Sequence, residues 1–459
     1  MTSLYSINYH TRAHKRDAFI EFIKSLLLTP FVLHTRPTIS TNEYGTAASK
    51  LGDKRSASSN HHGSAPPPLR AAASTADGES KARPEAYAKN VERYCEILQC
   101  VEELIADHME HQEQDLLELS RLSTLVPSIG RFFTTLPLKS SFMRQDAKRS
   151  IAARRFVPPS FNDVRAILND AQVTSIAPTI KLITFDGDMT LYADGADFAR
   201  DSDLVKLIID LLRHDLHVAI VTAAGYPGDA AKYEKRLSGL LAGFRDSGLP
   251  ASALERFYVL GGECNYLFCY DAKDAHLKYM EPETYQPADV TKWASDAPRV
   301  KELLDVAQET LAQCASEMGL AKAVGLLRKD RAVGVVAEEG VQLTRETLDE
   351  FALAAQRRLN NHQRAQQTRH GAAPVPFCAF NGGSDVWVDI GNKLIGVRML
   401  REFLGTHGNE TLHVGDQFLS TGNDISTRTA CCTVWITSPE ETAEVLTELC
   451  RLLDARGKK

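Results

Sequence analysis

The segment KLITFDGDMTLY, residues 181–192, joins a short apolar run to two aspartates. The run Leu182–Phe185 is followed by a turn-forming Asp-Gly pair, which is typical of a buried strand in a parallel sheet. Asp186 and Asp188 therefore stand just past the carboxyl end of that strand, where open α/β sheets place their ligands. An ordinary Asp-Gly turn explains the segment equally well by itself. The rest of the chain decides between a turn and a site.

Length and composition indicate a globular protein of two or three domains. The chain has 459 residues, of which 43% are hydrophobic and 24% charged, ordinary values for this class. A net charge of −6 is mild for this length and does not predict a nucleic-acid-binding surface. No apolar run approaches the roughly 20 residues that span a bilayer. The nine cysteines lack metal-type or disulfide-type spacing, so we expect reduced thiols in a cytoplasmic protein with neither nucleic-acid nor membrane partners.

A helix and a second strand follow the opening segment. Residues 203–214 have the apolar spacing of a helix, and the run His217–Val221 ends in Thr222. This order fits a right-handed parallel crossover. A helix beginning with a capping-box-like pair, Ser160 and Asp163, precedes the opening strand. We therefore predict an α/β fold with a Rossmann-like parallel sheet.

The middle of the chain predicts a separate domain. Residues 226–377 mix expected helices with short apolar runs, including a hairpin at residues 323–336 and a strand at residues 257–260. Such a mixture is typical of an α+β domain inserted into the sheet. The sheet resumes beyond it, and residues 161–225 and 378–459 are predicted to form the core.

Two polar motifs lie in the returning part of the sheet. Asn381-Gly382-Gly383-Ser384-Asp385 precedes the run Val386–Ile390, and Lys393 follows at the start of a helix. A short strand, Thr411–Val414, then ends in Gly415-Asp416. Lys393 and Asp416 are thus expected at the same edge of the sheet as Asp186.

Residues 1–160 are predicted to form a mainly helical N-terminal region. We expect a helix from residue 13 to residue 28, ending before Pro30, and another over residues 87–125 with His108 and His111 on its solvated face. Residues 41–85 are poor in large apolar side chains, so disorder is expected there. A basic run follows, comprising Lys139, Arg144, Lys148, Arg149, Arg154 and Arg155. It suits either a polyanion such as a nucleoside triphosphate or a solvated, subunit-facing helix side.

Phosphoryl transfer to a carboxylate explains the polar residues at the strand ends. A carboxylate nucleophile must approach a phosphate dianion, so cations have to offset their repulsion. Asp186 and Asp416 supply the pair of hard oxygen ligands that Mg²⁺ prefers. Lys393 adds a fixed positive charge, and the Thr222 hydroxyl can donate to a phosphate oxygen. Asp188 is close enough to act as general acid on the leaving alcohol and then as base for water.

This ordered set resembles the motifs of the haloacid dehalogenase-like phosphohydrolases over residues 178–459. The inserted block then corresponds to that superfamily's cap domain, similar to that of phosphomannomutases. The wording FDGDMTLY, VTAAGYPG, LGGECNYLF, FNGGSDVWVDIGNK and HVGDQFLSTGNDISTR narrows the resemblance to the IMP-specific 5'-nucleotidases of fungi and apicomplexan parasites. That resemblance implies Mg²⁺-dependent hydrolysis of inosine 5'-monophosphate (IMP) to inosine and phosphate by a cytosolic homotetramer. It also implies allosteric activation by ATP at the N-terminal region.

The resemblance also implies residue roles. Asp186 is the expected nucleophile and Asp188 the acid–base, with the Asp188 backbone carbonyl joining Asp186 and Asp416 on Mg²⁺. Thr222 and Lys393 are expected to hold the phosphate. The expected effector residues for ATP are Arg144, Lys148 and Arg149.

Three further positions remain open between a role and an ordinary loop. Asp194 contacts the ribose or base, or lies in a solvated loop. Asp385, with Asn381, Gly382 and Gly383, shapes the substrate pocket, or the glycines only form a turn before a strand. The wide spacing from Asp416 to Asp424 favours Asp424 as a support for the metal's ligands rather than as a ligand.

Two other functions fit parts of the pattern. A phosphosugar mutase or another phosphatase of the same superfamily is suggested by the position of the insertion. A non-catalytic nucleotide sensor would use the basic N-terminal run, but the intact set Asp186, Asp188, Lys393 and Asp416 argues against it.

Overall fold

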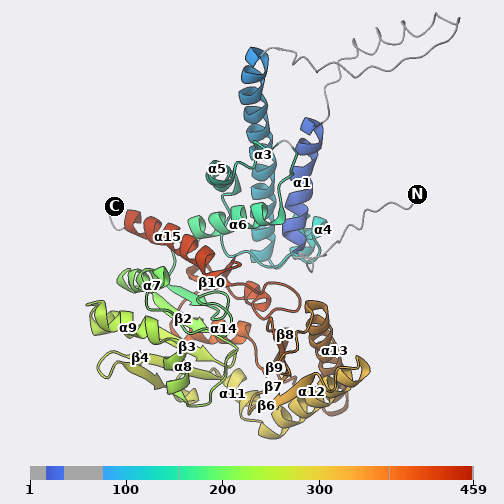
Figure 1. Ribbon diagram of the computed structural model, residues 1–459, viewed down its shortest axis with the longest axis vertical. Coiled ribbons are helices and arrows are strands. Elements are labelled where there is room, and N and C mark those ends of the chain that lie inside the picture. Colours follow the sequence, from blue (N-terminus) through green and yellow to red (C-terminus); the bar gives the residue numbers. More distant parts are fainter. Residues whose placement is uncertain (1–16, 36–75, 155, 372, 457–459) are drawn as a thin grey trace, which may run out of the picture.

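The chain folds around a seven-stranded sheet with strand order β11-β10-β1-β2-β3-β4-β5 (Figure 1). The computed structural model describes residues 17–35, 76–154, 156–371 and 373–456. The first five strands in this order, β11, β10, β1, β2 and β3, run parallel to one another. Strands β4 and β5 extend the sheet in antiparallel pairing. The predicted α/β class with a mostly parallel central sheet is confirmed. The strands are β1 Leu182–Phe185, β2 His217–Val221, β3 Phe257–Gly261, β4 Tyr266–Asp271, β5 His276–Tyr279, β10 Thr411–Gly415 and β11 Cys432–Trp435.

Helices cover both faces of this sheet because side chains alternate along each strand. Ile183 and Phe185 of β1 pack with one set of helices, whereas Leu182 packs with the other. The first face is covered by α6 (Phe161–Ile176), α7 (Asp203–Arg213), α9 (Ser238–Asp246) and α15 (Pro439–Arg456), and the second by α11 (Ala288–Ala294) and α14 (Lys393–Phe403). Helix α6 begins with the predicted capping box of Ser160 and Asp163. Shorter segments are α8 Ala230–Arg236, α10 Ala251–Leu254, η2 Pro282–Thr284, η3 Gly408–Glu410 and η4 Ile425–Thr429.

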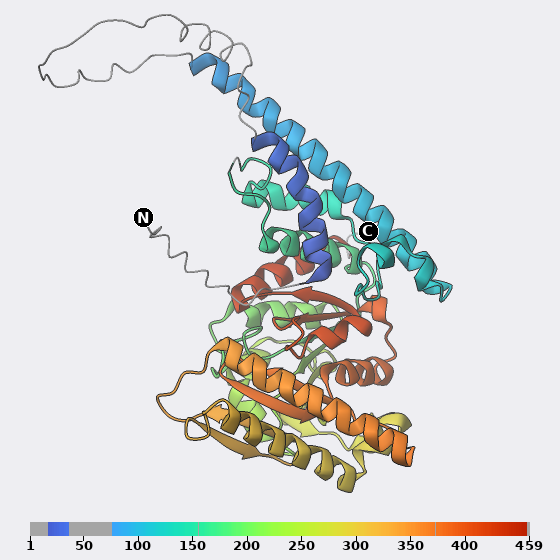
Figure 2. The same cartoon turned by 90° about the vertical axis from the view of Figure 1, so that its right-hand side faces the viewer.

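A second, antiparallel sheet has strand order β6-β7-β9-β8 and lies beside the first (Figures 1 and 2). Its strands are β6 Val324–Arg328, β7 Ala332–Ala337, β8 Phe377–Asn381 and β9 Asp385–Ile390. Two long helices, α12 (Ala297–Glu317) and α13 (Arg345–His370), pack against it and enclose a core of their own. The predicted hairpin at residues 323–336 is the β6–β7 pair.

The expected boundaries of the inserted domain, residues 226 and 377, do not match the sheets. At the first boundary, β3 pairs with β2 through Val218 and Phe257, so the first sheet continues to β5. At the second, β8 and β9 pair with each other and β9 pairs with β7, so both belong to the second sheet. A short apolar strand fits either sheet equally well, and only its hydrogen-bonded neighbour shows which one it joins. The second sheet and its helices therefore span residues 297–390.

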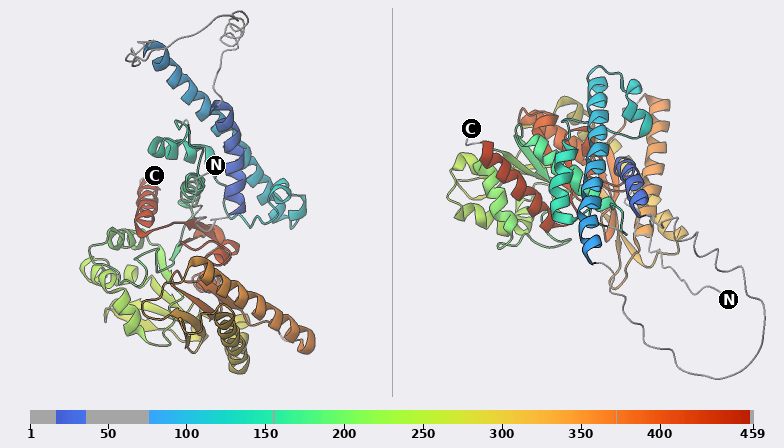
Figure 3. Two further views of the ribbon diagram at one scale, coloured as in Figure 1. Left: turned by 45° about the vertical axis from the view of Figure 1, so that its right-hand side comes forward. Right: turned by 90° about the horizontal axis from the view of Figure 1, so that it is seen from above.

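The N-terminal region is helical and builds a further core against α6 and β11. Its elements are α1 Ala18–Thr35, α3 Ala76–Glu113, η1 Leu117–Leu119, α4 Arg121–Leu125 and α5 Leu138–Arg149. Helices α1 and α3 run side by side and extend away from the sheets (Figures 2 and 3). Among the described residues, no helix combines the length and the apolar character that crossing a bilayer requires.

Several expectations for this region were wrong in detail. Helix α1 continues through Pro30 to Thr35, and residues 76–85 of the segment expected to be disordered are helical. The rest of that segment up to residue 75 lies outside the described residues. The helix expected over residues 87–125 ends at Glu113, where the chain turns back. His108 is buried rather than solvated. Its ring nitrogen Nδ1 forms a hydrogen bond with the Ser120 hydroxyl at 2.9 Å, since the chain after Glu113 folds back over it.

Candidate active site

The carboxyl ends of three neighbouring strands bring the predicted site residues together. Strand β1 lies between β2 and β10, with Phe185 level with both Ile220 and Val414. Asp186, Thr222 and Asp416 follow these strands and therefore meet at one edge of the sheet. Lys393 arrives there as the first residue of α14. The sequence-based placement of these four residues agrees with the described geometry.

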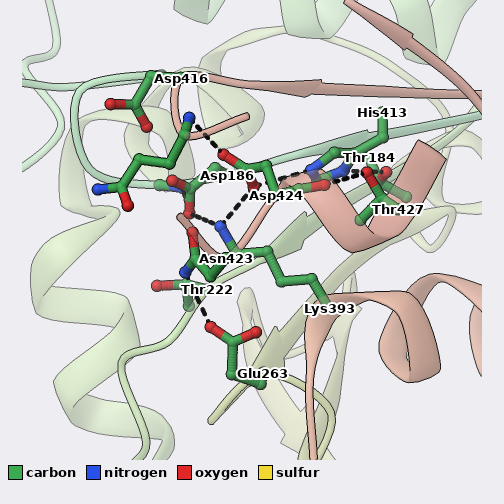
Figure 4. A network of polar contacts seen from close by, with 12 residues as sticks. Thr184, Asp186, Thr222, Glu263, Lys393, His413, Asp416, Asn423, Asp424 and Thr427 are labelled. Carbon is green, nitrogen blue, oxygen red and sulfur yellow. Dashed lines mark hydrogen bonds and ion pairs between the residues drawn. The ribbon is translucent and has the colours of Figure 1, made fainter. Parts of the chain in front are cut away.

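Lys393 is the buried centre of the site (Figure 4). Its side chain is 0% exposed, and its Nζ lies 2.7 Å from Asp186 Oδ1 and 2.7 Å from Asp424 Oδ1. Burial alone would lower the pKa of this ammonium, but the two carboxylates outweigh it and raise the pKa above its ordinary value. The lysine therefore stays charged at this edge of the sheet.

Asp424 lies inside the site, beside Lys393, although its wide spacing from Asp416 in the sequence had suggested a more peripheral position. It is fully buried, and its Oδ1 also pairs with His413 Nε2 at 3.0 Å, while its Oδ2 accepts from the Gln417 backbone at 2.9 Å. Burial alone would raise the pKa of Asp424. Lys393 and His413 lower this pKa by more than burial raises it, so the net pKa lies below the ordinary value of an aspartate. A Cβ on Gly415 would lie 2.4 Å from the Asp424 carboxyl carbon, which explains the glycine before Asp416.

The arrangement of carboxylates fits a divalent cation. One oxygen each of Asp186, Asp416 and Asp424 lies within 4.8 Å of the others, and Asp416 Oδ1 is buried without a hydrogen-bond partner among the described residues. Burial is the largest cause that raises the pKa of Asp186 to about 7, and Asp424 adds to it against the opposing charge of Lys393. Burial and Asp186 likewise raise the pKa of Asp416. Such crowding of acceptors is what a hard cation relieves.

Asp188 lies apart from this cluster. Its Oδ1 pairs with Arg236 Nη2 at 2.6 Å and accepts from the Gly195 backbone at 3.2 Å. The intervening loop is tight, because a Cβ on Gly187 would lie 2.5 Å from the hydroxyl oxygen of Tyr192. A Cβ added to Gly187 would also lie 3.5 Å from Thr222 Oγ1. The Thr222 hydroxyl therefore faces the loop that carries Asp186 and Asp188.

A cavity of about 380 Å³ opens beside Asp416. Asp194 lines it, together with the turn Asn381–Ser384 from the second sheet. Asp385 does not line it, since its carboxylate turns back toward Gly382, where an added Cβ would meet Asp385 Oδ1 at 2.2 Å. The second sheet is joined to the loop after Asp416 by the Asn381 backbone, which donates to the Thr421 carbonyl at 2.9 Å. The cavity is thus walled by both sheets.

The expected effector residues lie elsewhere. Lys148 and Arg149 border a cavity of about 950 Å³ among α5, α6, α7 and α15, but several carboxylates line it as well, including Asp170, Glu441 and Glu448. Arg144 donates through its Nε to Asp170 at 2.9 Å. The basic run is therefore partly neutralised by the protein itself.

Sequence reasoning did not identify three polar residues around the site. Arg236, the partner of Asp188, stands in a helix without any local signal. His413 interrupts an otherwise apolar strand, which was a visible sign. Glu263 follows the Gly261-Gly262 pair, and it accepts a hydrogen bond from Asn423 Nδ2 at 2.9 Å. Burial raises the pKa of Glu263 to about 7, opposed by Lys393.

The sequence of this chain is similar to those of known proteins over nearly its whole length. Residues 1–446 match the sequence profile of the family described as IMP-specific 5'-nucleotidase. IMP-specific 5'-nucleotidase 1 of Yarrowia lipolytica is 41% identical over 456 residues, covering 98% of this chain and 97% of that protein. The Neurospora crassa protein of the same name is 41% identical over 474 residues and covers 100% of both chains.

Solved structures of a Plasmodium falciparum enzyme are similar as well. The IMP-bound, N-terminally truncated IMP-nucleotidase superposes with a TM-score of 0.76 at 30% identity, covering 98% of this chain and 100% of the other. The ATP-bound IMP-nucleotidase gives a TM-score of 0.67 at 35% identity, covering 78% of this chain and 79% of the other. With a family profile that spans nearly the whole sequence and relatives similar from end to end, the chain belongs to the IMP-specific 5'-nucleotidase family.

Proposed function

We propose that the protein hydrolyses IMP to inosine and phosphate through an aspartyl-phosphate on Asp186. The observation that carries the proposal is the buried ion pair between Lys393 and Asp186, set beside the unpartnered oxygen of Asp416. This is a carboxylate held next to a fixed cation, as attack on a phosphate dianion requires. The seven-stranded sheet then corresponds to a haloacid dehalogenase-like core, and the second sheet with α12 and α13 to its cap.

The chain's own residues account for both chemical steps. A carboxylate oxygen of Asp186 attacks the phosphorus, the bond from phosphorus to the 5' oxygen breaks, and Asp188 gives its proton to the departing inosine. Asp188 then takes a proton from water, which attacks the aspartyl-phosphate and releases phosphate and free Asp186. Asp188 pairs with Arg236 in the described conformation, so these transfers require its carboxyl group to turn toward the phosphate.

Lys393 and Thr222 hold the phosphate during these steps through an ammonium and a hydroxyl donor. Asp186, Asp416 and the Asp188 backbone carbonyl would hold Mg²⁺, which supplies charge neutralisation for the phosphate when bound. Asp194 and the turn that includes Asn381 and Ser384 line the cavity of about 380 Å³, and we assign this cavity to the nucleoside.

We also propose activation by ATP, a homotetrameric assembly and a cytoplasmic location. ATP activation is supported by the ATP-bound structure of the Plasmodium enzyme. Lys148 and Arg149, beside the larger cavity, remain the proposed effector residues, and Arg144 contributes less because Asp170 already holds it.

The test is an assay of phosphate release with IMP, AMP, GMP and a pyrimidine monophosphate, using the native chain and Asp186→Asn. We expect IMP to be the preferred substrate and the variant to lose at least about 10³-fold in turnover. Asp201→Asn, at an exposed aspartate, is the matched control and should retain turnover. Retained turnover in Asp186→Asn would refute the nucleophile. In a separate incubation with hexose phosphates, isomerised ester without free phosphate would indicate a mutase instead.

A further inference from the structure

His413 is a polar side chain in the middle of the seven-stranded sheet. It stands in β10, level with Thr184 of β1 and Thr433 of β11, and its side chain is 0% exposed. Burying an imidazole is costly unless both ring nitrogens have hydrogen-bond partners. Both do, since Nδ1 lies 2.8 Å from Thr184 Oγ1 and Nε2 lies 3.0 Å from Asp424 Oδ1 (Figure 4). The ring therefore connects the interior of the sheet to the carboxylates of the candidate active site.

The partners of the ring decide which nitrogen carries the hydrogen. Burial would raise the pKa of Asp424, but Lys393 and His413 outweigh it, so Asp424 is an ionised carboxylate that only accepts hydrogen bonds. Nε2 must therefore donate to Asp424 Oδ1. Burial lowers the pKa of His413 by more than Asp424 raises it, so the ring is neutral. Nδ1 then has no hydrogen and accepts one from the Thr184 hydroxyl.

A neutral donor orients Asp424 without changing the charge of the site. Asp424 Oδ1 is shared by His413 Nε2 and Lys393 Nζ, while Oδ2 accepts from the Gln417 backbone. A cation in place of the ring would weaken the attraction between Asp424 and Lys393. An apolar side chain would remove one of the bonds that hold the Asp424 carboxylate, which lies close enough to Asp416 to turn toward it. A histidine avoids both effects.

We propose that His413, oriented by the Thr184 hydroxyl, is a positioning residue for the reaction. Its Nε2–H holds the Asp424 carboxylate on Lys393. That contact in turn keeps the ammonium beside the nucleophile, Asp186. The inference rests on the proposed function and adds a supporting residue to its site. His413 touches neither the phosphate nor the reacting atoms, and it acts through Asp424.

Two amide substitutions separate positioning from packing. In His413→Gln the side-chain NH₂ group can take the place of Nε2 and donate to Asp424, whereas the shorter side chain of His413→Asn reaches only the place of Nδ1. We expect kcat/KM for IMP to fall by about 10–100-fold in His413→Asn, the usual loss when such a supporting hydrogen bond is removed, and to stay within about 3-fold of the native value in His413→Gln. The inhibition constant for inorganic phosphate should rise in His413→Asn only. A role in packing alone would impair both variants equally.

His217→Asn is the matched control. His217 lies in β2 of the same sheet, level with Leu182 and thus at the end of the strands away from the site. Its replacement should leave kcat/KM unchanged.

Thr184→Val removes only the hydroxyl that orients the ring. We expect kcat/KM to fall by about 3–10-fold, the worth of one hydrogen bond, whereas Thr184→Ser should keep the native value.

The proposal is overturned if His413→Asn keeps the native kcat/KM, or if His413→Gln folds and is impaired as severely as His413→Asn. Should His413→Asn not fold, a native kcat/KM in Thr184→Val overturns it equally. A native chain that releases no phosphate from IMP would instead refute the proposed function.

Discussion

The acidic cluster at the sheet edge and the basic run that begins in α5 differ in how their charges are balanced. At the sheet edge, Asp186 and Asp424 share the Lys393 ammonium, an oxygen of Asp416 lies within 4.8 Å of theirs, and Asp416 Oδ1 has no partner in the described chain. In the basic run, Arg144 of α5 pairs with Asp170, and Arg154, which lies beyond the end of α5, pairs with Asp163. An excess of buried negative charge indicates a binding site for a cation, whereas charges that are paired one to one indicate a structural role.

Metal removal should disturb the acidic cluster most. We expect chelation by EDTA to reduce phosphate release by about 10³-fold or more, because the carboxylates then repel the phosphate, and Mg²⁺ to restore it. Mg²⁺ should also raise the unfolding temperature of the native chain but not that of Asp416→Asn, a readout independent of activity. A thermal shift that survives in Asp416→Asn would place the cation elsewhere.

Loss of the single ammonium should come next. Lys393→Met leaves two carboxylates uncompensated in the interior, so we expect the free energy of unfolding to fall by about 3–5 kcal/mol. Denaturant titration measures this change. Lys206→Met, at an exposed position, is the control and should stay within about 0.5 kcal/mol of the native chain. A similarly small effect of Lys393→Met would contradict the central role of that lysine.

A smaller effect is expected where charges are matched. Arg154→Met removes the partner of buried Asp163, and we expect a loss of about 2 kcal/mol. Burial by itself would raise the pKa of Asp163, but hydrogen bonds from Arg154 and Ser160 outweigh it and the net pKa is lowered. Its contribution is therefore present above the unfolded pKa of about 3.9 and is lost as the pH falls through the folded value. Acid unfolding of Arg154→Met should begin at a higher pH, and an unchanged acid limb would show that the pair is not important.

The smallest structural effect is expected from Lys148→Glu, which should alter the free energy of unfolding by less than about 0.5 kcal/mol. Phosphate release without ATP should stay the same, while activation by ATP should weaken because a cation beside the cavity becomes an anion. Lys139→Glu is the control, since its ammonium is held by Gln99 at 3.0 Å. An ATP response equal to that of the native chain would exclude Lys148 from the effector site.

Sequence patterns predicted which strand ends meet at one edge of the sheet better than they predicted the sheet that each strand joins. Asp186, Thr222 and Asp416 each end a short apolar strand, and parallel strands bring such ends together by geometry alone. The membership of β3 and β8 could not be predicted, because an apolar strand does not reveal its neighbour. The burial of Glu263 beside the site was missed because its side-chain partner, Asn423, is 160 positions away in the sequence.

The route of the chain between the two sheets has a consequence for protein engineering. Strand β9 ends at Ile390, and Lys393 follows after only Gly391 and Asn392. Gly391 crosses so close to Cys264 that an added Cβ would lie 2.1 Å from its sulfur. A graft that exchanges the second sheet for that of a relative must therefore be joined within this dipeptide and keep both the glycine and the small thiol. A splice one residue out of register would displace Lys393 and break its ion pairs with Asp186 and Asp424.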